Sequence, residues 1–275
     1  NIPEGKIMFN DQDYPSLRYP FEHGRFSTVV THSMTPWKQD LEALENEIIE
    51  HQPKYFAFSH VHYNTGVKTD LQSISAICKR HNVKTLVDGT QGIIVNQVNL
   101  EDLGIDAYLA STYKWCWGGY GAGVIAISRS LFEQLEHNTS NNNNVILKDR
   151  SLEYEPGIAS LEPGHFDHEP FFRLEKALRL IDQYGLDKIV KDVASLFAIA
   201  MDFATANNIE FIGQNVGKLN NIFCLPYNDG LAQALKARNI QCSVRGESIR
   251  FSIHAYNNQE DLFKLCDAIK STLPE

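Results

Sequence analysis

The sequence lacks any hydrophobic run long enough to cross a membrane. Its longest apolar stretches have the length of a strand, whereas a membrane-spanning helix needs about 20 predominantly apolar residues. No signal peptide is recognisable. Positive charge is also in short supply, because 25 Lys and Arg residues stand against 34 Asp and Glu, for a formal net charge of −9. That balance argues against general binding to nucleic acids or anionic membranes, which need a positive surface.

Cysteine is scarce, odd in number and scattered. No two cysteines form a C-x-x-C pair, which argues against structural zinc and against a disulfide framework. Reduced thiols and a cytoplasmic location fit this usage best. Histidines and acidic residues at 60, 62, 168 and 169 show no ligand spacing on a single element, so no metal site is predicted. The five cysteines are Cys78, Cys116, Cys224, Cys242 and Cys266.

The first half of the chain alternates strand-like and helix-like segments. Short β-rich runs separated by helical periodicity predict βαβ units and a mostly parallel sheet covered on both faces. The expected strands are 6–10, 27–32, 54–61, 83–88, 107–112 and 123–128, and the expected helices are 37–50 and 70–82.

A polar segment, NTSNNNNVILKDRSLEYEPG, then interrupts the pattern and is interpreted as a surface loop. A long helical region is expected from about residue 170 to 207, followed by a smaller α+β portion. Its strand signals are IEFIG, NIFCLPY, IQCSV and IRFSIH, and a final helix is expected over 259–273. We therefore predict a large domain, 1–175, and a second unit, 176–275, made of a linking helix and a small domain.

One lysine stands where a buried strand should end. Lys114 lies in STYKWCWGGYGAG (111–123), between the apolar runs AYLA and GVIAIS. Lysines are usually solvated surface residues. In an open parallel sheet, binding residues gather at the carboxyl ends of the strands, and SHVHYNTG (59–66) and DGTQ (88–91) follow two other predicted strands in the same way. A chemical role for Lys114 is therefore worth testing.

Asp88 and Lys114 are one crossover apart and could face the same cleft. A partly buried ion pair that neutralises itself is one interpretation. The other is a Schiff-base lysine whose pKa is lowered by burial or by a neighbouring cation. Pyridoxal phosphate needs such an amine, a carboxylate against its pyridinium nitrogen, and donors for its phosphate. Ser111 could supply a phosphate hydroxyl.

The segments VDGTQ, AYLASTYKWCWGGYGAG and IRFSIHAYNNQEDL together resemble the class V aminotransferase family of fold type I pyridoxal-phosphate enzymes. That family includes cysteine desulfurases, kynureninases and isopenicillin N epimerase-like proteins. The resemblance runs from about Ile7 to Leu273. It implies an α/β fold with a mostly parallel sheet and helices on both faces, a smaller C-terminal α+β domain, and pyridoxal 5'-phosphate as cofactor.

The resemblance assigns roles to particular residues. Lys114 resembles the lysine that forms the Schiff base, and Asp88 its pyridinium partner. Gln91 resembles the contact to the phenolic oxygen of the cofactor, and Ser111 a phosphate ligand. Tyr14, in DYPS after the first strand, resembles the residue that stacks on the cofactor ring, where desulfurases use His.

Two further positions near the cofactor are less clearly assigned. Tyr113 stands where the family usually has His, Gln or Arg, yet its phenol can still donate one hydrogen bond. In the loop after the third strand, one of His62, Tyr63 and Asn64 is expected to reach the cofactor. Asn64 is taken as the candidate, although the sequence does not choose among the three.

The resemblance also implies a substrate site and a second subunit. Arg250 matches the arginine that receives the substrate carboxylate, for which a bidentate guanidinium is well suited, and Arg245 is the alternative. Gly164-His165 aligns with a loop that reaches the phosphate of the neighbouring subunit, although His replaces the usual Thr. A homodimer with shared active sites is therefore expected.

Two departures from the family affect the expected activity. Relatives carry roughly 80–100 further N-terminal residues with a phosphate-binding loop, so we expect this chain to be a fragment rather than a natural short form. SVRGES also passes directly into IRFS, without the loop cysteine that persulfide chemistry needs, and Cys242 is expected to pack. Transamination of an amino acid or small amine is therefore the expected reaction. A lyase, an epimerase, or a cofactor-free pseudoenzyme or binding protein is the alternative.

Overall fold

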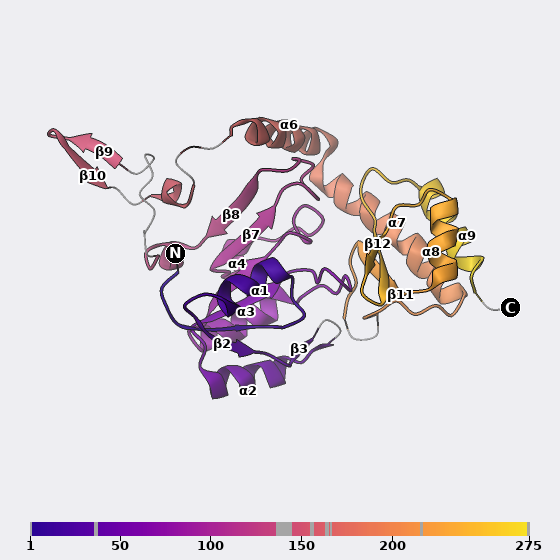
Figure 1. Ribbon diagram of the computed structural model, residues 1–275, viewed down its shortest axis with the longest axis horizontal. Helices are drawn as coiled ribbons and strands as arrows, with labels where there is room; N and C mark the ends of the chain where they lie inside the picture. Colours follow the sequence, from indigo (N-terminus) through magenta and orange to yellow (C-terminus); the bar gives the residue numbers. More distant parts are fainter. Residues whose placement is uncertain are drawn as a thin grey trace.

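A six-stranded sheet forms the centre of the larger part of the molecule (Figure 1). The computed structural model describes residues 2–35, 38–135, 145–154, 157–162, 165, 167–214 and 217–273. The strands lie in the order β2-β1-β5-β6-β7-β8. All neighbours are parallel except β7 and β8. The strands are β1 (Lys6–Phe9), β2 (Ser27–Val30), β5 (Tyr55–Ser59), β6 (Lys84–Asp88), β7 (Ala107–Ser111) and β8 (Gly123–Ile127).

Successive side chains of the central strands enter two different cores, as the two-residue period of a strand requires. In β5, Phe56 and Phe58 join one apolar cluster, whereas Tyr55 and Ala57 join the other. The helices α2 (Leu41–His51), α3 (Leu71–Arg80) and α4 (Leu100–Leu103) cover the first core. The second core is covered by α1 (Pro15–Glu22) and α5 (Arg129–Phe132). The predicted fold class, a mostly parallel sheet with helices on both faces, is confirmed.

Local capping explains where the helices begin. Asp40 accepts a hydrogen bond from the Ala43 backbone N–H at 3.0 Å, and Asp70 accepts one from Ser73 at 3.1 Å. These bonds satisfy backbone donors that a helix leaves unpaired at its first turn. The prediction that the first of these helices starts at residue 37 was wrong, because β3 (Met34–Thr35) and β4 (Lys38–Gln39) form a short hairpin before it.

The polar segment predicted as a loop contains a two-stranded hairpin of β9 (Val145–Lys148) and β10 (Ser151–Tyr154). Asp149 and Arg150 connect the strands with φ values of 49° and 67°. Two left-handed residues are what a two-residue type I′ hairpin turn requires. A short 3₁₀ helix, Ile158–Leu161, follows. In Figure 1 the hairpin projects away from the two sheets.

The predicted helical region is two helices, α6 (Glu169–Tyr184) and α7 (Leu186–Ala206). Gly185 separates them with φ of 96°, a left-handed conformation that suits glycine. Helix α7 then leads to a three-stranded antiparallel sheet in the order β11-β13-β12 (Figure 1). Its elements are β11 (Ile222–Pro226), α8 (Asp229–Ala237), β12 (Ser243–Arg245), β13 (Ser248–Ser252) and α9 (Gln259–Lys270).

This C-terminal sheet has an apolar core of its own. Phe223 stacks on Phe211 with ring centroids 4.3 Å apart and on Phe251 at 5.0 Å. The IEFIG segment is a turn rather than the predicted strand, yet Phe211 within it is 1% exposed. Leu196 of α7 also belongs to this core. The division of the chain at residue 175 stays a prediction.

Replacing Phe223 by alanine is expected to lower the free energy of unfolding by about 3–5 kcal/mol, the usual cost of removing a buried phenylalanine ring. The midpoint of urea denaturation, followed by circular dichroism, measures this loss. Phe263→Ala is the matched control, because Phe263 is 54% exposed, and its effect should stay within about 0.5 kcal/mol. Equal losses in the two variants would contradict the stacked core.

Candidate active site

The strand ends that the sequence singled out meet at one edge of the large sheet. Ser59, the last residue of β5, is in register with Asp88, the last residue of β6. Asp88 is in turn in register with Leu109 of β7, which ends two residues later at Ser111. Because these strands are parallel, their carboxyl ends place Ser59, Asp88 and Ser111 side by side.

Lys114 follows this edge and its amine is unpaired. Its side chain is half-buried, and Nζ forms no hydrogen bond or ion pair with any residue that the structure describes. The Nζ atom lies 5.8 Å from the centroid of the Tyr14 ring and 5.4 Å from that of Tyr113. Burial lowers the pKa of Lys114, and the charge of Arg250 lowers it further. The amine therefore loses its proton more readily than an exposed lysine does.

Asp88 acts on Lys114 without forming a salt bridge to it. Its negative charge raises the pKa of Lys114, in opposition to burial. One of its carboxylate oxygens accepts a hydrogen bond from the Thr90 backbone N–H at 2.9 Å. The ion pair that we considered from the sequence does not form between these two described residues. The carboxylate and the amine instead share one electrostatic environment.

Gln91 and Ser111 lie beside Asp88. Gln91 is buried, and its side-chain oxygen accepts a hydrogen bond from the indole N–H of Trp115 at 3.0 Å. An indole can only donate, so this bond fixes which end of the amide is the oxygen. The Gln91 NH₂ group therefore points away from Trp115. The Ser111 backbone N–H donates to the Thr90 hydroxyl at 3.1 Å.

Two tyrosine rings, Tyr14 and Tyr113, lie beside the amine, and each contacts a further tyrosine. The Tyr14 ring meets the Tyr63 ring edge-on, with centroids 5.1 Å apart, and Tyr14 is 37% exposed. Tyr113 stacks on Tyr120 at 4.6 Å. Burial raises the pKa of Tyr113, so its hydroxyl keeps its proton and can act as a donor. Aromatic faces of this kind could hold a planar ring.

The sequence did not decide which residue of the loop after β5 reaches a ligand. The contacts of this loop reduce the number of candidates. Both ring nitrogens of His62 are engaged, Nδ1 with the Thr65 hydroxyl at 3.2 Å and Nε2 with the Gln12 carbonyl at 2.8 Å. Burial lowers the pKa of His62 to about 4. The side-chain oxygen of Asn64, in contrast, is buried without a hydrogen-bond partner in the described chain. Asn64 and Tyr63 therefore remain the candidates for a ligand contact.

Arg250 and Arg245 bring two positive charges to the same place from neighbouring strands. Arg250 Nη1 donates to the Tyr63 carbonyl at 2.8 Å, while its Nε is buried without a partner in the described chain. Burial lowers the pKa of Arg250, and the charge of Arg245 lowers it further. Neither guanidinium forms an ion pair with a described residue. Two unpaired guanidiniums form a site suited to a carboxylate.

The structure does not bring His165 to this site. Its side chain is exposed, and it makes no contact with Lys114 among the described residues. Its neighbour Gly164 lies outside the described residues. The predicted contact to a neighbouring subunit therefore stays a prediction. The structure likewise describes no group of three or more His, Cys, Asp or Glu side chains placed to hold a metal ion.

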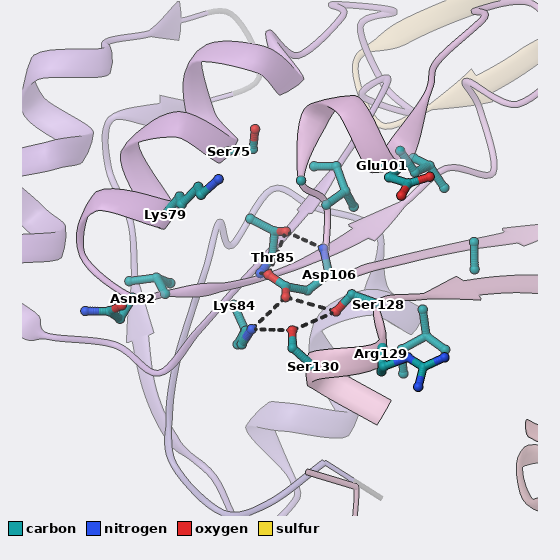
Figure 2. A pocket seen from close by; sticks show the side chains of 16 residues that line it. Ser75, Lys79, Asn82, Lys84, Thr85, Glu101, Asp106, Ser128, Arg129 and Ser130 are labelled. Carbon is teal, nitrogen blue, oxygen red and sulfur yellow. Dashed lines mark hydrogen bonds and ion pairs between the residues drawn. The ribbon is translucent and has the colours of Figure 1, made fainter. Parts of the chain in front are cut away.

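A large pocket lies at the opposite edge of the sheet, away from Lys114. Its volume is about 650 Å³, and Figure 2 shows the side chains of Lys84, Asp106, Ser128 and Ser130 joined by hydrogen bonds. Lys84 Nζ donates to the Asp106 carboxylate at 2.8 Å and to the Ser130 hydroxyl at 3.0 Å. Asp106 also accepts from Ser128 at 3.1 Å. These groups satisfy each other and leave no orphaned buried atom for a ligand.

Comparison with known proteins identifies the family. The profile of the "Aminotransferase class-V" family matches residues 4–265. The chain belongs to this family.

Relatives within it carry two kinds of name. The chain is 22% identical over 269 residues to "Uncharacterized aminotransferase YcbU" of Bacillus subtilis, covering 96% of this chain and 71% of the relative. It is also 22% identical over 258 residues to a "Probable cysteine desulfurase" of Borreliella burgdorferi, covering 83% of this chain and 60% of the relative. The chain thus spans less than two thirds of that second relative.

Solved structures share the fold of this class V chain. An apo cysteine desulfurase from Thermococcus onnurineus has a TM-score of 0.83 and 17% identity, covering 98% of this chain and 73% of the other. The cystine C-S lyase C-DES, solved with cysteine persulfide, has a TM-score of 0.84 and 18% identity, covering all of this chain and 77% of the other. Another C-DES structure has glycine linked to its PLP cofactor. The predicted cofactor is therefore the one that homologues use.

The residues of this class V chain fit that cofactor chemically. A pyridine ring with a phosphate and an aldehyde needs a reactive amine, a carboxylate and polar donors. Lys114 offers an unpaired amine of lowered pKa, and Asp88 offers the carboxylate. Asn64 has an orphaned buried oxygen and Arg250 an orphaned buried nitrogen. Unsatisfied buried polar atoms are rare in folded proteins, so their gathering here points to a polar ligand.

Asp13 and His254 are residues of this site that the sequence interpretation did not single out. Asp13 is 5% exposed and accepts a hydrogen bond from the Ser59 hydroxyl at 2.6 Å. Burial raises its pKa to about 7, and the negative charge of Asp88 contributes. The signal was available, because Asp13 follows β1 at the carboxyl edge where Ser59 and Asp88 follow their own strands. His254 contacts the lysine loop from the C-terminal sheet, and nothing local in the sequence indicates that contact.

Replacing Asp13 by asparagine is expected to change how stability depends on pH. The folded-state pKa is about 7, against an ordinary value of 3.8. Between these values the folded chain holds a proton that the unfolded chain releases, so the wild type loses stability as pH rises, by at most about 1.4 kcal/mol per pH unit. An asparagine at this position carries no such proton. The stability of the variant relative to the wild type should therefore rise from about pH 4 to 7 and then level off.

Urea denaturation at a series of pH values measures this difference. Asp11→Asn is the control, because the Asp11 side chain is exposed, and it should follow the wild type throughout. A constant offset between Asp13→Asn and the wild type across the same pH range would show that Asp13 is charged in the folded chain.

Proposed function

We propose that this chain carries the active site of a pyridoxal-phosphate-dependent enzyme that transfers the amino group of an amino acid or small amine. The observation that supports it most is the half-buried amine of Lys114, which has no hydrogen-bond or ion-pair partner among the described residues. Its pKa is lowered by burial and by Arg250, whereas the charge of Asp88 raises it. An amine with this environment is a better nucleophile near neutral pH than an exposed lysine.

Each neighbour of Lys114 takes a part in holding the cofactor. Asp88 would pair with the ring nitrogen, and the NH₂ of Gln91 would donate to the phenolic oxygen. Ser111 and Tyr113 would donate to the phosphate. Tyr14 and Asn64 would contact the ring and its substituents. The cofactor, when bound, supplies an electron sink that makes a proton at the substrate Cα removable.

Arg250 and Lys114 then act on the substrate. The two guanidiniums of Arg250 and Arg245 bind its carboxylate, which orients the Cα–H bond toward the amine. Lys114 Nζ would take the proton from Cα as a general base and donate it back to complete the amino transfer. Its lowered pKa increases the unprotonated fraction, which is the form that can accept that proton.

The turn between β12 and β13 favours transamination over persulfide chemistry. Strand β12 ends at Arg245 and β13 begins at Ser248, so only Gly246 and Glu247 connect them. A connection of two residues leaves no room for a mobile loop that carries a nucleophilic cysteine. Cys242 precedes the strand. The prediction that Cys242 packs was wrong, since it is exposed, whereas Cys116 is buried.

A lyase of the same family is the second candidate. The structure with a TM-score of 0.84 is a cystine C-S lyase, and several of the curated relatives are named cysteine desulfurases. Elimination needs the same lysine base and the same carboxylate clamp, and no loop cysteine.

We further propose a homodimer with shared sites, in which His165 reaches the partner's phosphate.

Absorbance and product analysis test these proposals. Adding pyridoxal phosphate to the purified chain should produce an absorption band at about 410–430 nm. Incubation with an amino acid and a keto acid should then yield the exchanged amino and keto acids. Release of pyruvate and ammonia or sulfide without a keto acid would favour the lyase. A protein that stays colourless at a saturating concentration of cofactor would contradict both the aminotransferase and the lyase proposals.

A further inference from the structure

We propose that His254 is a positioning residue, which ties the C-terminal sheet to Lys114 and Gln91 through Trp115 and Trp117. The proposal concerns how Lys114 and Gln91 are held in place. Only the effect of that positioning on catalysis rests on the proposed function. His254 lies two residues after β13 and is 7% exposed. Its contacts reach across the chain to the loop that carries Lys114.

The first contact is a stack of three rings. The His254 ring is parallel to the Trp115 indole, with an interplanar angle of 6° and centroids 5.0 Å apart. Tyr256 stacks on His254 at 4.2 Å and 19°. Trp115 is 3% exposed, and it shares an apolar cluster with Val193 of α7 and Ile222 of β11. The residue next to Lys114 is therefore packed against elements of the C-terminal part.

The second contact is a hydrogen bond that fixes the state of the imidazole. The Trp117 indole N–H donates to His254 Nε2 at 3.0 Å. Because an indole can only donate, Nε2 must accept, so the ring is neutral with its proton on Nδ1. Burial lowers the pKa of His254 to about 4, which keeps the ring neutral, while the Lys114 backbone favours the protonated form. Nδ1 is buried and has no hydrogen-bond partner among the residues that the structure describes.

The backbone of the loop needs this support. Trp117 has a φ of 57°, a left-handed conformation that is rare for a bulky side chain and strains the backbone. Such a conformation persists only where surrounding contacts impose it. The bond to His254 and the ring stack supply those contacts, three residues from Lys114.

The third contact links the position of His254 to the orientation of the Gln91 side chain. The same Trp115 that stacks on His254 donates its indole N–H to the Gln91 oxygen. Since the indole ring is held by His254, the orientation of the Gln91 amide is held as well. His254 therefore positions two predicted cofactor-site residues at once, from a sheet that contains neither of them.

Chemical labelling of Lys114 tests the proposal without any cofactor. The pH dependence of trinitrophenylation is measured by peptide mass spectrometry, with the exposed Lys236 as internal reference. His254→Phe keeps a stacking ring and removes the acceptor, and Trp117→Phe keeps a ring and removes the donor. Each should let water reach the amine and raise the labelling midpoint of Lys114, on the order of one pH unit. The double variant should shift it no further than either single variant.

His254→Gln is the rescue variant, because its amide oxygen can still accept from Trp117, and its midpoint should lie closer to the wild type. Nitrogen NMR of histidine-labelled protein should show the His254 proton on Nδ1 near neutral pH. An unchanged Lys114 midpoint in folded Trp117→Phe or His254→Phe, judged by circular dichroism, overturns the proposal, as does a proton on Nε2. A wild type that never binds cofactor refutes the proposed function but leaves this labelling result intact.

Discussion

Lys114→Ala is expected to abolish covalent attachment of pyridoxal phosphate, so borohydride treatment should leave no label on the chain above background. The physical reason is that the Lys114 amine has a lowered pKa and feels the charge of Asp88, and alanine removes the nitrogen that would form the bond. Mass spectrometry of the reduced protein, with the labelled peptide mapped, measures the loss.

Lys68→Ala is the matched control. Lys68 is also half-buried, and burial together with the charge of Lys218 lowers its pKa. Comparing the two variants therefore tests whether a buried amine of lowered pKa is sufficient for covalent attachment of the cofactor. Lys68→Ala should keep the wild-type amount of label on the Lys114 peptide. Label that moves to another lysine in Lys114→Ala, at undiminished yield, would show that the cofactor reacts with whichever amine is available rather than with a built site.

The architecture of the large sheet was predictable because its signals are local. A run such as YFAFS indicates a strand buried on both faces, and the helix predicted over 70–82 begins at its Asp70 cap. The errors came where local signals compete with distant ones. IEFIG has the composition of a strand, yet Phe211 reaches the core from a turn because Phe223 and Cys224 bind that segment from across the sheet.

In the candidate site, too, features with local signals could be predicted and features that depend on distant contacts could not. Lys114, Asp88 and Ser111 could be predicted because each ends or follows a strand, and parallel strands place their carboxyl ends together. The contact between Trp117 and His254 spans 137 residues and that between Ser59 and Asp13 spans 46. No pattern within either segment specifies such a pair. The electrostatic state of Asp13 depends on burial, which composition cannot give.

Asp88→Asn is expected to lower both the affinity for the cofactor and the pKa of Lys114, because both depend on the same carboxylate. Asparagine keeps an oxygen for the Thr90 N–H bond and removes the negative charge. Hydrogen bonds to charged groups contribute about 1.5–3 kcal/mol, so cofactor affinity should fall about 10- to 150-fold. Dialysis against increasing volumes, followed by absorbance, measures the retained cofactor.

The same substitution should make Lys114 easier to deprotonate rather than harder. Asp88 is the group that raises the pKa of Lys114, and burial, Arg250 and Arg245 all lower it. Without the carboxylate charge the ammonium form loses its main stabilising partner, so the labelling midpoint of Lys114 moves to lower pH. The pKa of Asp13 should also fall from about 7, because Asp88 contributes to raising it. A Lys114 midpoint that rises or stays in place in the folded variant would mean that Asp88 does not share the site of the amine, and the assignment of Asp88 to the ring nitrogen would fall with it.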